Sequence, residues 1–171
     1  MKTTASTAQP LHPSTRSRRA CLQLAGSGLA LALLPGTVLS VTPAGPLIEV
    51  WKDPNCGCCK DWITHVRERG FAVKVSDSGN TAMRKRLGID LKYGSCHTAL
   101  VGGYAIEGHV PAREIQRLLR ERPKALGLAV PGMPVGSPGM DGEVYGNRRD
   151  PYDVLLLAAA GGAASVYQAY R

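Results

Sequence analysis

Residues 47–62 read LIEVWKDPNCGCCKDW, and this stretch organises the rest of the chain. Its first part, 47–51, is rich in residue types that are frequent in β-strands, so it predicts a strand. The following Asp53-Pro-Asn predicts a turn. A helix is expected from about 58 to 69 and ends at Gly70, the residue type preferred just beyond a helix C-terminus. The cysteines of this stretch therefore lie between a strand and the start of a helix.

The cysteine spacing at this junction is typical of two chemistries. Cys56 and Cys59 form the C-x-x-C motif of redox enzymes, whereas Cys58 turns the group into a cluster that suits a metal. A thiol at a helix N-terminus lies in the positive field of the helix dipole, which favours the thiolate. Thiolates are soft ligands that select Cu(I), Zn or iron–sulfur clusters. Helical spacing directs Cys59 toward the core and leaves Cys58 nearer the surface, beside a solvated His65.

Residues 1–44 resemble an export signal rather than part of the fold. They hold basic residues without acidic ones, then an apolar run over 21–34, then small residues. This run is shorter than the roughly 20 residues that span a bilayer. Arg18-Arg19 before it indicates a twin-arginine signal, with an ordinary secretory signal as the alternative. We expect export to the periplasm, no stable membrane insertion of the mature chain, and one domain over 45–171.

Removal of the signal lowers the net charge of the chain. The full chain has 21 basic and 13 acidic residues, and 1–44 holds four basic residues and no acidic one, which leaves the mature chain at +4 instead of +8. Short basic runs such as 84–86 are expected at the solvated surface. No dense basic stripe with interleaved aromatic residues remains, so the sequence argues against nucleic-acid binding.

The order of the remaining elements predicts an α/β protein of thioredoxin-like fold, with a central mixed sheet and flanking helices. That fold places its redox motif between the first strand and the following helix. Between about 128 and 140 the chain is rich in Gly, Pro and Met, which predicts a long loop. The other expected elements are a strand at 71–75, a helix at 81–87, a hairpin at 98–107, a helix between Pro111 and Pro123, and strands at 154–158 and 165–170.

Cys96 and His97 are expected to face the C-x-x-C across the site, just before the third strand. Redox thioredoxins have a cis-proline in this segment, but the sequence here is Ser-Cys-His-Thr over 95–98. Four converging thiols exceed what a dithiol enzyme needs, and they suit a metal ion or a small metal cluster. His97 is a candidate ligand because it adjoins Cys96.

Further candidate ligands lie in the second half of the chain. Met133 and Met140 each follow a glycine in the loop, and a thioether binds Cu(I) better than Zn(II), although methionines also fill gaps over a core. His109 is either a ligand or a residue that holds the loop by a hydrogen bond.

Several motifs together resemble the CopG-like family of exported bacterial proteins that are linked to copper resistance. The resemblance implies a thioredoxin-like protein of the periplasm that holds Cu(I), as a thiolate-bridged cluster of several ions. Carried over to this chain, it implies Cys56, Cys58, Cys59 and Cys96 as bridging ligands, with nearby His and Met residues as terminal or outer partners. The motifs lie at 51–59 (WKDPNCGCC), 95–99 (SCHTA), 108–111 (GHVP), 132–140 (GMPVGSPGM) and 150–153 (DPYD).

The leading hypothesis is therefore a periplasmic copper-binding protein for copper resistance, more a metal-binding protein than an enzyme, with Cu(I)/Cu(II) interconversion as an added role. Its expected partners are copper ions and other periplasmic copper-handling proteins. The alternatives are a thiol–disulfide oxidoreductase that uses Cys56 and Cys59, and a structural zinc site in an interaction module.

Overall fold

The computed structural model describes residues 45–159 and 162–171, so the expected export signal lies outside the described residues. Within them, no helix is both long and apolar enough to cross a membrane. The stretch that opens the chain's fold forms strand β1 (Leu47–Lys52) and helix α1 (Gly57–Glu68), close to the expected bounds.

The described strands form one mixed seven-stranded sheet in the order β2-β1-β3-β4-β5-β6-β7. Strand β1 is parallel to β2 and antiparallel to β3, and β3 is antiparallel to β4. Strand β5 is parallel to β4, and the two last strands continue the sheet antiparallel to their neighbours. The remaining elements are β2 (Ala72–Ser76), α2 (Thr81–Arg86), η1 (Leu91–Tyr93), β3 (His97–Val101), β4 (Tyr104–Glu107), α3 (Ala112–Glu121), β5 (Gly127–Ala129), η2 (Glu143–Tyr145), β6 (Tyr152–Leu157) and β7 (Ser165–Tyr170).

The prediction of an α/β protein with a mixed sheet and flanking helices is confirmed. Strand β5 was not predicted, because it has only three residues and all three are buried, so it carries no alternation of apolar and polar side chains. It begins where the Gly/Pro/Met loop was expected to begin, and the irregular segment of the structure runs from 130 to 151.

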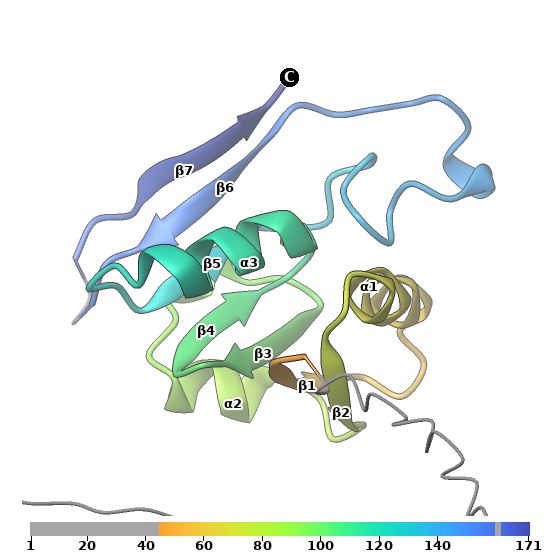
Figure 1. Ribbon diagram of the computed structural model, residues 1–171. Coiled ribbons are helices and arrows are strands. Elements are labelled where there is room, and N and C mark those ends of the chain that lie inside the picture. Colours follow the sequence, from red (N-terminus) through yellow and green to blue (C-terminus); the bar gives the residue numbers. More distant parts are fainter. Residues whose placement is uncertain (1–44, 160–161) are drawn as a thin grey trace, which may run out of the picture. The chain divides into compact units, whose positions relative to one another are not determined.

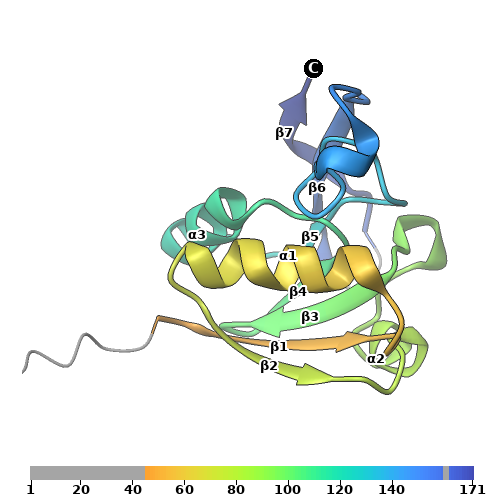
Figure 2. The ribbon, with the colours of Figure 1, turned by 90° about the vertical axis from the view of Figure 1, so that its right-hand side faces the viewer.

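Helices α1 and α3 cover one face of the sheet and α2 lies on the other (Figures 1 and 2). Successive side chains of β4 point to opposite faces of the sheet. Ile106 belongs to the larger buried cluster, under α1 and α3, and Ala105 belongs to the smaller cluster on the other face. The larger cluster includes Ile48, Val50, Trp62, Val66, Ile115, Leu118 and Leu128, and the smaller one includes Ile89, Ala129 and Leu157.

The loop over 130–151 packs against the first turn of α1. Gly139 has a positive φ of 85°, and a Cβ at this position would lie 2.6 Å from the Cys58 carbonyl oxygen and 2.8 Å from the Trp62 nitrogen. Only glycine therefore fits at this close approach. Asp150 ties the end of the loop back to Val135, because its backbone N–H donates to the Val135 carbonyl at 2.8 Å and its Oδ2 accepts from the Val135 N–H at 3.1 Å. The loop is thus held over the cysteine end of α1.

Candidate metal centre

The start of α1 distributes its three cysteines as the helical spacing predicts. Cys56 is the N-cap residue, with an extended backbone and no side-chain cap, so the sulfurs rather than a polar side chain occupy this helix end. Cys59 is fully buried, while Cys56 and Cys58 are partly exposed. The helix end therefore presents sulfur both to the core and to the surface.

Cys56 and Cys59 are joined by a disulfide, and Cys58 and Cys96 are free. The C-x-x-C thus stands in its oxidised form, in which its sulfurs are not thiolates. The expectation of four simultaneous thiolates therefore applies to a reduced form of the protein.

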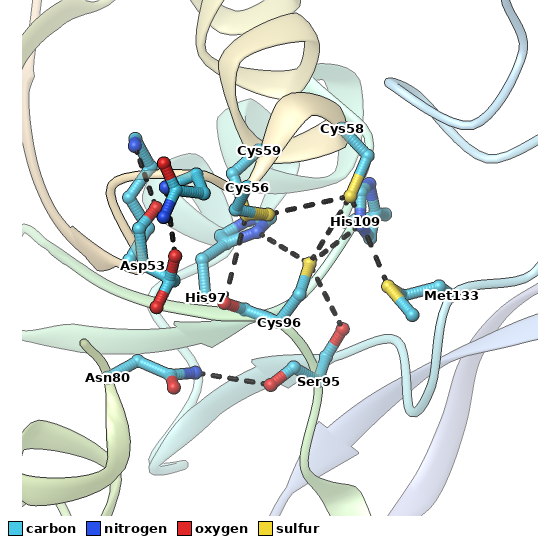
Figure 3. The surroundings of a disulfide bond; sticks show 12 residues. Asp53, Cys56, Cys58, Cys59, Asn80, Ser95, Cys96, His97, His109 and Met133 are labelled. Carbon is cyan, nitrogen blue, oxygen red and sulfur yellow. Dashed lines mark hydrogen bonds between the residues drawn. A yellow bond between two sulfur atoms is a disulfide. The ribbon is translucent and has the colours of Figure 1, made fainter. Parts of the chain in front are cut away.

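Cys96 lies opposite the cysteines of α1, in the residue just before β3 (Figure 3). Its Sγ is 3.8 Å from Cys58 Sγ, and Cys58 Sγ is 3.6 Å from Cys56 Sγ. The buried Cys59 Sγ is 3.7 Å from the Cys96 carbonyl oxygen. All four sulfurs lie within 4.8 Å of one another, a separation that shared metal ions can bridge.

Two buried histidines face Cys96 from its inner side. His109 Nε2 is 3.0 Å from Cys96 Sγ, and His109 Nδ1 is 2.8 Å from the Pro138 carbonyl oxygen. A carbonyl only accepts, so Nδ1 carries the proton and the Nε2 lone pair points at the sulfur. His97 Nδ1 lies 3.4 Å from the same sulfur, and His97 Nε2 is buried with no hydrogen-bond partner among the described residues.

Burial lowers the pKa of His109. Burial, together with the neighbouring His109, also holds the pKa of His97 well below its ordinary value. Both rings are therefore neutral at physiological pH, and a neutral imidazole is the form that binds metals. Burial and the neighbouring Cys58 raise the pKa of Cys96 to about 12. Cys96 thus keeps its proton until a cation at the site stabilises its thiolate.

The loop brings one of the two predicted thioethers to the cysteines. Met133 Sδ lies 4.0 Å from Cys58 Sγ, and the side chain is half exposed. Met140 Sδ instead accepts a hydrogen bond from the Tyr145 hydroxyl at 3.3 Å. Met133 therefore stands at the open side of the cluster, and Met140 is engaged within its own loop.

A buried carboxylate holds the segment that carries Cys96. Glu107 Oε1 accepts from the Ser95 N–H at 2.7 Å and from Arg84 Nε at 2.8 Å, and Oε2 accepts from the Thr98 hydroxyl at 2.6 Å. Arg84 Nη2 and Asn80 Nδ2 donate to the Ser95 carbonyl. The peptide groups on both sides of Ser95 are therefore fixed, and with them the backbone of Cys96.

Glu107 and Arg84 are the residues of the site that the sequence analysis missed. Arg84 was expected at the surface with the basic run 84–86, but its side chain is only 11% exposed and it pairs with the fully buried Glu107. Burial raises the pKa of Glu107, while Thr98, Ser95 and Arg84 act in the opposite direction. An acidic residue at the end of an otherwise apolar strand could have drawn attention to Glu107, but it does not identify Arg84 as its partner.

Two side chains of α1 join the helix to α3 and to the segment before it. Trp62 Nε1 donates to the Val110 carbonyl at 2.8 Å, and the Trp62 ring packs on the His97 ring with centroids 4.3 Å apart. His65 is half buried rather than solvated, because its Nε2 accepts the Ala112 N–H at 3.1 Å. Trp62 thus supports the site directly, whereas His65 binds the first residue of α3.

Comparison with known proteins identifies related chains. The family described as "Protein of unknown function, DUF411" matches residues 93–140, which hold Cys96, both buried histidines and both loop methionines. No curated protein matches the chain. The solved structure titled "Copper resistance protein copG- Form 2" is 48% identical, covers 74% of this chain and 98% of its own, and has a TM-score of 0.68. The structure titled "Copper resistance protein copG- Form 1" is 49% identical, covers 72% of this chain and 96% of its own, and has a TM-score of 0.66.

Proposed function

Since the chain belongs to the family of the copper resistance protein CopG, we propose that it binds copper and acts in copper resistance. The observation that carries this proposal is the convergence of four cysteine sulfurs within 4.8 Å, with the His109 lone pair directed at one of them. A partly buried set of sulfur and imidazole donors is the environment that Cu(I) prefers.

The copper is proposed to be Cu(I) in a thiolate-bridged cluster of several ions, formed when the disulfide is reduced. Neighbouring sulfurs at 3.6 and 3.8 Å are close enough to share metal ions. Cys56, Cys58, Cys59 and Cys96 are the bridging candidates. The two buried histidines and Met133 are the terminal or outer candidates, and Met140 is a candidate only after its bond to Tyr145 breaks.

Zinc is the less favoured metal for this site. Four thiolates alone satisfy a structural zinc ion, but a thioether at 4.0 Å from Cys58 Sγ adds nothing to such a site and suits Cu(I). A structural zinc ion also contributes to folding, so its removal unfolds small zinc domains. The core of this chain has its own two buried clusters, and we expect the stripped protein to remain folded.

The fold and the compartment are proposed along with the metal. The strand order β2-β1-β3-β4, with β3 antiparallel to the other three, supports a thioredoxin-like fold with the site between β1 and α1. The signal-like segment 1–44 supports export to the periplasm, where copper ions and other copper-handling proteins are the partners.

A second candidate function is favoured by the Cys56–Cys59 disulfide. A disulfide that gains two electrons becomes two thiolates, and two Cu(I) ions that give up one electron each become two Cu(II) ions. The chain could in this way interconvert the two copper states. Oxidoreductase activity on protein thiols is the alternative, and the replacement of the thioredoxin cis-proline by the Cys96 segment argues against it.

Copper and free thiols counted in the same purified, reduced mature chain test the proposal. We expect more than one copper per chain in the wild type and a clear loss in Cys96→Ser, because this sulfur contacts Cys58, His97 and His109. Full copper stoichiometry in Cys96→Ser would contradict the four-sulfur site. Reduction of insulin disulfides that persists after copper chelation would favour the oxidoreductase instead.

A further inference from the structure

We propose that the Cys56–Cys59 disulfide sets how many copper ions the site holds, and that the disulfide form keeps a site for one ion. This one-ion site consists of the Cys58 and Cys96 sulfurs and His109 Nε2. The inference rests on the proposed copper-binding function and adds that the redox state of the disulfide controls the number of copper ions bound. Reduction then enlarges a site whose two sulfurs are already in place, rather than creating one.

The two free sulfurs are already spaced as ligands of a single ion. A metal–thiolate bond is about 2.3 Å long, and trigonal or tetrahedral angles then place two ligating sulfurs about 3.8 to 4.0 Å apart. Cys58 Sγ and Cys96 Sγ are 3.8 Å apart, with the disulfide in place. One ion fits between them without a change in the backbone of α1 or β3.

His109 supplies the third donor in the orientation that a ligand needs. Its Nδ1–H is bound to the Pro138 carbonyl, so the unprotonated Nε2 faces Cys96 Sγ at 3.0 Å. A metal ion that replaces the thiol proton lies between the same two atoms and lengthens their separation. The Pro138 hydrogen bond fixes the ring from behind, as outer partners of metal-bound histidines commonly do.

The open side of this site carries a weaker donor. Met133 Sδ is 4.0 Å from Cys58 Sγ and half exposed, so it can approach an ion held by Cys58 or withdraw from it. Two thiolates, one imidazole and one mobile thioether form a complete donor set for one soft ion. The His109 ring moves closer to Cys58 when the ion binds, because its nitrogen lies within 4.8 Å of the Cys96 and His97 ligand atoms but not also of Cys58 Sγ. His97 Nδ1, at 3.4 Å from Cys96 Sγ, is a second imidazole within reach.

The disulfide limits the site to one ion through charge. Two thiolates balance one Cu(I) and leave one negative charge, but each further cation in this partly buried place needs another anionic donor. The sulfurs of a disulfide carry no such charge. Reduction by a dithiol adds two electrons and yields two new thiolates, and Cys56 Sγ lies 3.6 Å from the Cys58 sulfur that already holds the first ion. Added ions therefore share sulfurs with the first.

Silver titration of the wild-type chain is the most direct test, because Ag(I) is a soft ion that does not reduce disulfides. We expect one Ag(I) per chain when the disulfide is intact and several when it is reduced, counted by native mass spectrometry with thiol quantification. Equal silver counts in the two states, or no silver in the disulfide state, would overturn the inference.

A double variant tests the same claim with Cu(I). Cys56→Ser/Cys59→Ser lacks the two switchable thiolates and should hold one Cu(I) in competition with a chelator, with sulfur and nitrogen neighbours at the copper X-ray absorption edge. Adding Cys96→Ser should abolish this binding, and His109→Gln should weaken it at least tenfold. His65→Gln is the matched control, because that histidine binds Ala112 instead of a sulfur.

The outcomes separate this inference from the proposed function. Absence of copper from the reduced wild type would refute the proposed function itself. Several ions in the reduced wild type but none in the double variant would leave the proposed function standing and refute the one-ion site. Circular dichroism checks that each variant is folded, and the silver titration needs no variant at all.

Discussion

The two halves of the metal centre are held in different ways. The half at the start of α1 carries Cys56 and Cys59 in a disulfide and has no side-chain cap. The half at the start of β3 carries Cys96 in a segment fixed by the buried Arg84–Glu107 pair. The first half can change its chemical state, while the second keeps its position. A site that gains and loses sulfur ligands needs one such fixed side to preserve its geometry.

The largest loss of stability is expected from a substitution in the fixed half. Glu107→Ala leaves Arg84 buried without its carboxylate and frees the Ser95 N–H, so we expect a loss of about 3–5 kcal/mol in the free energy of unfolding. Urea unfolding of the copper-free protein measures it. Glu49→Ala is the control, since Glu49 pairs with the exposed Lys74, and it should cost less than about 1 kcal/mol. Equal losses in the two variants would show that Glu107 does not fix the segment.

The next largest loss of stability is expected from reduction of the half at the start of α1, which can change its chemical state. Reduction of the Cys56–Cys59 disulfide opens a very short loop, so the copper-free protein should lose only about 2 kcal/mol of stability. Thermal unfolding with and without a dithiol reductant checks this value. Unfolding of the reduced, copper-free chain at room temperature would mean that the disulfide holds the fold itself, contrary to the distinction between the halves.

An effect of similar size is expected between the halves, at Trp62. Trp62→Phe keeps an aromatic ring beside His97 but removes the hydrogen bond to the Val110 carbonyl. We expect a loss of about 1–3 kcal/mol, because a buried carbonyl is left without its donor. Chemical denaturation measures the change, and the copper stoichiometry should stay that of the wild type. A changed stoichiometry would show that Trp62 governs the ligands and not only the packing.

The smallest effect concerns the open side of the centre. Met133→Leu should leave the stability unchanged, because the side chain is half exposed, and should weaken Cu(I) binding by about tenfold or less. Competition with a Cu(I) chelator measures the affinity. Met140→Leu is the comparison, and it should leave the affinity unaltered because Met140 Sδ is bound to Tyr145. A larger effect in Met140→Leu would reverse the assignment of the two thioethers.

The sequence predicted six of the seven described strands and the convergence of Cys96 with the C-x-C-C cluster. These features depend on apolar patterns and on element order, both of which are local properties of a sequence. Strand β5 was not predicted because its three residues are all buried and show no alternation of apolar and polar side chains. From the sequence, free thiols are expected at the C-x-x-C, whereas the structure joins Cys56 and Cys59 in a disulfide. The spacing of the two residues alone does not distinguish these states.

The fixed half could not be predicted from local patterns. Arg84 lies on a six-residue helix, which is too short for a periodicity that would tell its buried face from its solvated one. Its partner Glu107 comes 23 positions later, and only the packing of α2 against the sheet brings the two together. The two roles considered for His109, ligand or loop-holding residue, could not be separated for the same reason, since the Pro138 carbonyl that orients this ring belongs to a distant loop.

X-ray absorption at the copper edge of the reduced, copper-loaded wild type tests the central claim most directly. The account predicts Cu(I) with a shell dominated by sulfur, a nitrogen contribution from histidine, and a short copper–copper distance from shared thiolates. A shell of oxygen and nitrogen alone, with the cysteines still open to alkylation, would contradict the proposal that these four sulfurs hold the metal.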